Sequence, residues 1–249
     1  MICVWKKRTE TLAELLVRVK IEQEISPEEK VTYAGRLDPM AEGLVVLLVG
    51  SEVYEKDRMI GLSKEYEVEI LFGIGSDTDD VLGIYTLGSS IVLTRAVVKS
   101  HLAEFVGSRE ESYPSYSSKT VDGKPLWQWH RQGKIGQVTI PTHIETIDDI
   151  ALLSLTTKKS SEVFKKIKND VPKVIGDFRQ EEILERLDTI TFLLPRELTV
   201  AKIRVTVQSG TYMRTLARRV GEALGTKALA LSITRTKVGD LVKEHCDMR

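Results

Sequence analysis

The stretch that decides the fold runs from residue 35 to residue 50 and has the sequence GRLDPMAEGLVVLLVG. Asp38 lies between Gly35 and Gly43, and Pro39 follows it directly. Glycine allows backbone angles that other residues avoid, and proline fixes its own φ, so this segment would hold one carboxylate in a rigid loop. An ordinary Asp-Pro turn has the same local sequence and is common in soluble proteins. The loop alone therefore does not separate a catalytic aspartate from a turn residue.

Six apolar residues follow this loop, from Leu44 to Val49, and they form either a buried strand or a buried helical turn. Apolar and polar residues alternate over 64–72 and 200–207, which is typical of half-buried strands. Helical spacing of apolar residues occurs in three segments, 12–19, 94–105 and 216–224. Strands interspersed with helices predict an α+β fold with a mixed sheet.

Three further segments occur in the order of the motifs of a known enzyme family. They are Lys64-Glu65-Tyr66, Ser76-Asp77-Thr78-Asp79-Asp80-Val81-Leu82-Gly83 and Gly210-Thr211-Tyr212-Met213-Arg214-Thr215-Leu216-Ala217. Together with the Asp38 loop they resemble the TruB family of tRNA pseudouridine synthases, from about Lys6 to Leu241. The resemblance implies the pseudouridine synthase fold, an α+β fold with a mixed central β-sheet and flanking helices.

The chemistry of this family turns uridine into pseudouridine. A C–N glycosidic bond breaks, the base turns, and C5 of uracil joins the sugar, which requires a nucleophile and a proton relay. The resemblance identifies Asp38 as the catalytic aspartate and Arg214 as its partner, for which we expect bidentate contact in a largely dry site. Tyr66 matches the tyrosine that stacks on the target base and is a candidate for taking the C5 proton.

Each of these assignments has a structural alternative. Arg214 could be a surface residue on a basic helix, and Tyr66 could be an aromatic strand residue packed in the core. Tyr212 is expected to line the same pocket, with core packing as its alternative. The sequence leaves these alternatives open for the two tyrosines, whereas the close motif match favours the functional role of Arg214.

The three aspartates of the second motif suggest a metal loop at first sight. An EF-hand that begins at Asp77 would place Val81 at a ligand position and Leu82 where glycine is needed. No His or Cys is near them in the sequence to build a transition-metal site. We therefore expect no metal here, and the isomerisation that the resemblance implies requires no cofactor.

A segment rich in Tyr and Ser, residues 112–123, is followed by one that combines Trp with Lys and Arg. Aromatic residues beside cations suit single-stranded RNA, and both stretches resemble a further family segment. RNA contacts are expected from Tyr33, Arg36, Lys64, Lys119, Lys124, Arg131 and Tyr212. The chain departs from the family at two of these positions, because Tyr33 stands where histidine is usual and Arg36 where threonine is usual.

Composition limits the remaining possibilities. Lys and Arg number 36 and Asp and Glu number 36, so the net charge of zero does not favour a highly basic binder. From residue 214 to 249, however, eight basic residues accompany four acidic ones, and such a patch can bind phosphate. Two cysteines, Cys3 and Cys246, fit a reducing compartment, and no membrane-length apolar run or secretory signal is present. We expect a cytoplasmic protein.

We expect residues 1–249 to form one pseudouridine synthase catalytic domain. The stretch at about 156–195 departs from the family and is interpreted as an insertion. Within it, residues 160–187 are charged and helical in pattern, with interruptions at Pro172 and Gly176. Many relatives have a C-terminal PUA domain, and none is expected here after Leu241. The expected partner is tRNA, through its TΨC stem-loop, with no protein partner, no membrane contact and a monomeric chain.

The sequence thus predicts a tRNA pseudouridine synthase that acts on the TΨC-loop uridine, conventional position 55, through Asp38. Two alternatives stay open. One is a non-catalytic RNA-binding or tRNA-folding protein on the same scaffold, for which Tyr33 argues weakly and against which Asp38, Tyr66 and Arg214 argue. The other is a synthase that acts on another RNA, which Arg36 suggests.

Overall fold

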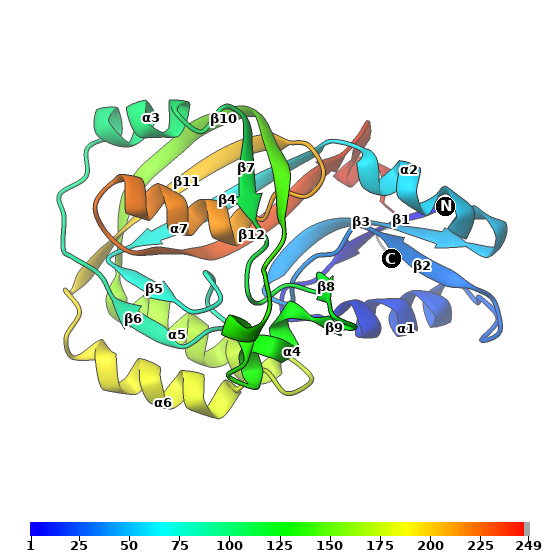
Figure 1. Cartoon of the computed structure of the whole chain (residues 1–249), viewed down its shortest axis with the longest axis horizontal. Coiled ribbons are helices and arrows are strands. Elements are labelled where there is room, and N and C mark those ends of the chain that lie inside the picture. The colour runs from blue at the N-terminus through cyan, green and yellow to red at the C-terminus, as the bar shows by residue number, and fades with distance from the viewer. Residues whose placement is uncertain (247–249) are drawn as a thin grey trace.

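A nine-stranded mixed β-sheet forms the centre of the computed structural model, which describes residues 1–246 (Figure 1). Across the sheet the strands are β1 (Ile2–Lys6), β3 (Ala41–Val49), β12 (Ala228–Val238), β4 (Lys64–Phe72), β11 (Glu197–Val207), β10 (Thr142–Lys159) and β7 (Gly107–Ser112). β2 (Val31–Ala34) pairs with β3, and β13 (Leu241–Val242) pairs with β12. β3 and β12 are parallel, whereas their other neighbours pair antiparallel. The α+β fold with a mixed sheet is confirmed.

Helices and short hairpins surround this sheet. The helices are α1 (Leu12–Glu22), α2 (Lys56–Gly61), α3 (Arg95–Ala103), α4 (Leu126–Arg131), α5 (Ser160–Asp170), α6 (Gln180–Thr191) and α7 (Met213–Ala223). The hairpins are β5 (Ile74–Ser76) with β6 (Tyr85–Leu87), and β8 (Thr120–Val121) with β9 (Lys124–Pro125). Short 3-10 turns complete the order: η1 (Gly50–Glu55), η2 (Ile135–Gln137), η3 (Val171–Lys173) and η4 (Lys243–His245).

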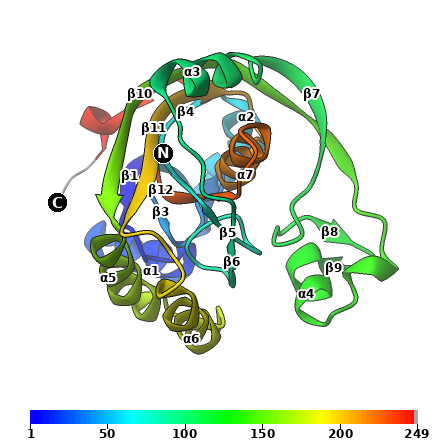
Figure 2. The same cartoon turned by 90° about the vertical axis from the view of Figure 1, so that its left-hand side faces the viewer.

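Alternation along the strands divides the core between the two faces of the sheet. On β4, Val68 and Ile70 belong to a cluster with side chains of α3 and α7, whereas Leu71 belongs to a cluster with side chains of α5 and α6. Helices therefore cover both faces, and Figure 2 shows α7 and α5 on opposite sides of the strands. The same view shows β8, β9 and α4 as a small unit in the connection between β7 and β10, away from the central sheet.

Local sequence explains several element boundaries. The apolar run 44–49 is a strand, because it belongs to β3, whose residues Leu44–Leu48 are almost fully buried between two core clusters. Thr11 caps α1 through a reciprocal pair of hydrogen bonds with Glu14. The helical pattern in 160–187 is confirmed as well: α5 ends just before Pro172, and α6 begins after Gly176.

The two ends of the described chain lie together. The Sγ atoms of Cys3 and Cys246 are 2.7 Å apart and buried, in the same core cluster as Leu44 and Met59. Their separation in the sequence gives no sign of this contact. Within residues 1–246 no helix is long and apolar enough to cross a membrane.

Candidate active site

The Asp38 loop connects β2 to β3, and the close approach of β12 shapes it. Gly43 has a φ of +121°, and a Cβ atom there would lie 2.3 Å from the carbonyl oxygen of Arg235 on β12. Glycine is therefore required at this position, as the sequence suggests for a rigid loop. Within the turn, the backbone N–H of Ala41 donates to the carbonyl of Asp38 at 3.0 Å.

Two buried cations hold the loop by its backbone. The Lys6 ammonium donates to the carbonyl oxygens of Pro39 and Ala41 at 3.2 and 2.6 Å, and both residues follow Asp38 in the sequence. The Arg235 guanidinium donates to those of Gly35, Arg36 and Leu44, at 3.3, 3.1 and 2.7 Å. Both side chains are almost fully buried, and desolvation lowers the pKa of Lys6 to about 8. Carbonyls before and after Asp38 are thus fixed from two strands.

Asp38 and Arg214 are paired, as the sequence predicts. The Nε atom of Arg214 donates to Oδ2 of Asp38 at 2.9 Å, from the first turn of α7, where the helix dipole also favours an anion. The expected bidentate contact is wrong, because the other two guanidinium nitrogens donate to the carbonyl oxygens of Thr78 and Tyr116, at 3.0 and 2.6 Å. The guanidinium is therefore held in three directions.

The expectation of a dry site holds for only one partner. The Arg214 side chain is 5% exposed, whereas that of Asp38 is 41% exposed. Oδ1 of Asp38 has no hydrogen-bond partner within residues 1–246. The pair thus consists of a buried cation and a carboxylate with one oxygen open to solvent.

The three aspartates after Ser76 point to different partners. Asp77 pairs with Arg179, and Asp79 pairs with Arg218. Asp80 is buried and accepts hydrogen bonds on Oδ1 from the Thr78 hydroxyl and from a backbone N–H. No group of three or more His, Cys, Asp or Glu suited to a metal ion occurs in the described part of the chain. These carboxylates organise the loop that faces Arg214.

Burial raises the pKa of Asp80 from its ordinary value of 3.8 to about 6, although the Arg214 charge opposes this shift. The folded protein binds the Asp80 proton more tightly than the unfolded chain does. Protonation of Asp80 therefore contributes fully to the unfolding free energy below about pH 4, and this contribution is lost as pH rises through 6. Asp80→Asn keeps the Oδ1 acceptor and removes the charge. We expect the variant to exceed the wild type in unfolding free energy near pH 7.5, by at most about 3 kcal/mol.

Thermal unfolding at about pH 4.5 and pH 7.5 checks this prediction. The difference in Tm between Asp80→Asn and the wild type should be small at the lower pH and larger at the higher one. An equal difference at both pH values would show that Asp80 does not titrate in this window.

Tyr66 lies on β4 with only 8% of its surface exposed. It packs in the same core cluster as Leu37 and Met213, the residues that precede Asp38 and Arg214. The packed alternative therefore describes the free protein. A role in base stacking or proton transfer stays a prediction, and it requires a base that reaches the ring at the edge of this cluster.

Tyr33, which stands where the family has histidine, lies close to two cations. Its ring centroid is 5.6 Å from the Arg36 guanidinium carbon and 5.7 Å from the Lys56 ammonium. These contacts place two positive charges near the Asp38 loop. The sequence points to Tyr33 and Arg36 through the motif, but Lys56 lies in a charged stretch that resembles ordinary surface.

Lys64 begins β4 at a buried position, with 5% of its surface exposed. Its ammonium donates to the carbonyl oxygens of Ile60 and Leu62 at the end of α2. Desolvation, together with the Arg235 charge, lowers its pKa to about 8. Lys64 is committed to backbone carbonyls in the free protein, and its expected RNA contact stays a prediction that would require it to leave them.

The segment 113–133 presents cations over aromatic rings. The Lys119 ammonium is 4.8 Å from the ring centroid of Tyr113, and the Lys124 ammonium is 4.9 Å from that of Trp129. Both lysines are exposed, which leaves their charges accessible to an anionic ligand. Arg131 differs, because it pairs with Asp177 in the loop between α5 and α6.

An aromatic cluster borders the Asp38–Arg214 pair. Tyr113 stacks on His143 with ring centroids 4.1 Å apart, and Tyr212 meets both rings edge-on at 6.3 Å. The Arg214 guanidinium carbon lies 5.5 Å from the Tyr212 ring. Burial raises the pKa of Tyr212, so its hydroxyl stays protonated at neutral pH. His143 is a neighbour that no motif pointed to.

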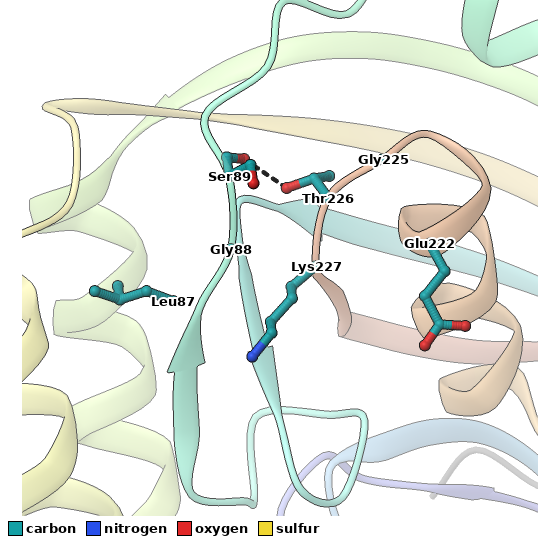
Figure 3. A pocket seen from close by; sticks show the side chains of 7 residues that line it. All are labelled: Leu87, Gly88, Ser89, Glu222, Gly225, Thr226 and Lys227. Atoms are coloured by element: carbon teal, nitrogen blue, oxygen red, sulfur yellow. Dashed lines mark hydrogen bonds between the residues drawn. The ribbon is translucent and has the colours of Figure 1, made fainter.

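A surface hollow of about 440 Å³ lies at the other end of α7 (Figure 3). Glu222 and Lys227 are the charged residues of its lining, and the Thr226 hydroxyl donates to the Ser89 carbonyl beside them. None of its lining residues belongs to the Asp38 site. The hollow is therefore separate from the Asp38 loop.

A comparison with protein families agrees with this geometry. Residues 23–171, over half of the chain, match the model described as TruB family pseudouridylate synthase, N terminal domain. The chain belongs to the TruB family. The matched range contains Asp38, Tyr66 and the 113–133 segment, whereas Arg214 lies beyond it.

Curated relatives match the chain over most of its length. A tRNA pseudouridine synthase B of Burkholderia mallei is 30% identical over 217 residues, which is 87% of this chain and 58% of that protein. A protein of the same name from Synechocystis is 29% identical over 219 residues, 88% of this chain and 60% of that protein. The chain thus spans about three fifths of the length of these TruB relatives.

Solved structures share the fold. A chain in the crystal structure of a Cbf5-Nop10-Gar1 complex has a TM-score of 0.59 and 16% identity, over 97% of this chain and 49% of that chain. A chain in an H/ACA RNP bound to a substrate RNA that contains 2'-deoxyuridine has a TM-score of 0.54 at the same identity. At this identity the likeness shows the fold alone.

Proposed function

We propose that this chain is a tRNA pseudouridine synthase that isomerises the TΨC-loop uridine, conventional position 55, with Asp38 as nucleophile. The observation that supports it best is the contact of 2.9 Å between Arg214 and Asp38, on two motifs of the TruB family. The names of the curated relatives support tRNA as the substrate. The proposal includes a cytoplasmic location and a monomeric chain, as the sequence predicts.

The geometry suits a nucleophile that forms a bond from one oxygen. Arg214 holds Oδ2 of Asp38, and Oδ1 has no hydrogen-bond partner and is not buried within the described residues 1–246. In the reaction the N1–C1′ bond breaks, the C5–C1′ bond forms, the proton on C5 leaves, and N1 gains a proton, so that substrate and product are isomers. Asp38 would bond transiently to the uracil ring or to C1′, and Arg214 would stabilise the carboxylate each time it is released. We propose Tyr66 as the group that stacks on the base and takes the C5 proton.

Exposed cations beside aromatic rings would bind the RNA. Lys119 and Lys124 lie over Tyr113 and Trp129, and Arg36 lies over Tyr33. Rings of this kind stack on unpaired bases, and the cations pair with phosphates. The local positive charge compensates for the zero net charge of the chain.

A substrate comparison tests the proposal. The wild-type chain is incubated with a TΨC stem-loop transcript and with a ribosomal RNA hairpin of the same length, and pseudouridine is measured after digestion to nucleosides. The proposal predicts product from the stem-loop alone. Product from the hairpin alone would indicate a synthase for another RNA, and tight binding of the stem-loop without product would indicate a non-catalytic RNA-binding protein.

A further inference from the structure

Residues 176–179, the last part of the connection between α5 and α6 and called here the 176–179 loop, contact the active-site region at several points. The Arg179 guanidinium donates to both carboxylate oxygens of Asp77, at 2.7 and 3.1 Å, and its central carbon lies 4.8 Å from the Tyr116 ring centroid. Asp177 accepts from Arg131 through both its carbonyl and its carboxylate. Two residues of this loop thus hold the 113–133 segment, and Arg179 also holds the loop that contains Asp77.

The same two segments supply the carbonyls that fix the catalytic guanidinium. Arg214 donates to the carbonyl of Thr78, the residue after Asp77, and to that of Tyr116 itself. The Tyr116 hydroxyl also donates to Asp77 at 3.2 Å, which ties the two segments to each other. A continuous set of polar contacts therefore runs from Arg179 to Arg214 and on to Asp38.

The backbone of the 176–179 loop is held in one conformation, which fixes the position of Arg179. Arg179 has a φ of 63°, in the left-handed region that non-glycine residues avoid, and it is the N-cap residue that directly precedes α6. The Gln180 side chain donates to the carbonyls of Val174 and Gly176, both at 2.8 Å, and accepts from the backbone N–H of Phe178. The Arg179 side chain is only 18% exposed, so its direction is fixed by its neighbours.

We propose that Arg179 is a positioning residue of the active site: it holds Asp77 and Tyr116 so that their segments fix the guanidinium of Arg214. This inference rests on the proposed function for its kinetic consequence. It gives the α5–α6 region, within the stretch expected to diverge from the family, a defined task in this chain. The task is to hold the 113–133 segment against the catalytic pair before RNA arrives.

The proposal predicts a specific kinetic change for Arg179→Ala. A small displacement of Arg214 and Asp38 should lower kcat by about 10- to 100-fold, with a smaller change in KM. Arg179→Lys, which keeps a charge but lacks the planar fork that makes two parallel bonds to Asp77, should recover part of the loss. The matched control is Lys168→Ala, which removes an ion pair with Asp188 between α5 and α6, away from these contacts.

Hydrogen exchange provides a readout that does not depend on activity. In the free protein, Arg179→Ala should raise the exchange rate of amides in 113–133, such as that of Trp127, which bonds to the Ser117 carbonyl. Lys168→Ala should leave this rate unchanged. Unchanged exchange in Arg179→Ala, or equal increases in both variants, would overturn the inference. An inactive wild type would refute the proposed function. The exchange result would then still show whether Arg179 holds the 113–133 segment.

Discussion

Asp38→Asn should lose pseudouridine formation by about 10⁴-fold or more, as expected when the nucleophile of an enzyme is removed. Asparagine has nearly the same shape but lacks the charge and nucleophilicity of a carboxylate. Since Oδ1 has no hydrogen-bond partner within residues 1–246 and is the proposed attacking oxygen, the loss should appear in the chemical step. Single-turnover rates on a TΨC stem-loop, with nucleosides separated by chromatography, measure this step.

Folding and binding are the controls for Asp38→Asn. The Asp38 side chain is 41% exposed, and Arg214 retains its bonds to the Thr78 and Tyr116 carbonyls, so we expect a change in stability of less than about 1 kcal/mol. RNA affinity should stay within a few-fold of the wild type. An Asp38→Asn variant that converts the uridine within tenfold of the wild-type rate would exclude Asp38 as the nucleophile.

Arg214→Met should reduce both activity and stability. The loss of the guanidinium removes the stabilisation of the Asp38 carboxylate, which we expect to cost about 10²- to 10³-fold in kcat. It also leaves two carbonyls without a donor and removes the opposing charge near buried Asp80. A buried acceptor left without its donor typically costs about 1–3 kcal/mol, so a fall in unfolding free energy of about 3 kcal/mol is expected.

The pH dependence separates the two causes of the Arg214→Met stability loss. Without the guanidinium the pKa of Asp80 should rise further above 6, because Arg214 is the charge that lowers it in the wild type. The difference in unfolding free energy between the wild type and Arg214→Met should therefore become smaller as pH falls below 6, because Asp80 is then protonated in both proteins. Denaturant unfolding at several pH values measures it. A difference that widens at low pH would contradict the assigned role of Arg214.

The sequence predicted those features that leave a local pattern. Alternation over 64–72 and 200–207 correctly predicted β4 and most of β11, because each strand buries one side of its pleat more regularly than the other. The pairing of Asp38 with Arg214 followed from the resemblance to the family. The buried run 44–49 stayed ambiguous, since a strand covered on both faces has no alternation to separate it from a helix.

The side chains that hold the Asp38 loop and Arg214 in place leave no local pattern in the sequence. Lys6 and Arg235 are cations, and cations are usually expected at the surface. Both are buried here, because backbone carbonyls in and beside the Asp38 loop accept their hydrogen bonds. The bidentate prediction failed for Arg214 for a similar reason, since carbonyls 98 and 136 residues away compete for its nitrogens. Likewise, Arg179 lies 102 residues from Asp77.

A site-resolved map of pseudouridine in a full-length tRNA transcript would show whether Asp38 modifies one uridine of the TΨC loop. Chemical labelling and primer extension would compare RNA treated with the wild type and with Asp38→Asn. The proposed mechanism predicts one modified uridine in the TΨC loop with the wild type and none with the variant. Modification that persists with Asp38→Asn, or a transcript that the wild type leaves unmodified, would contradict it.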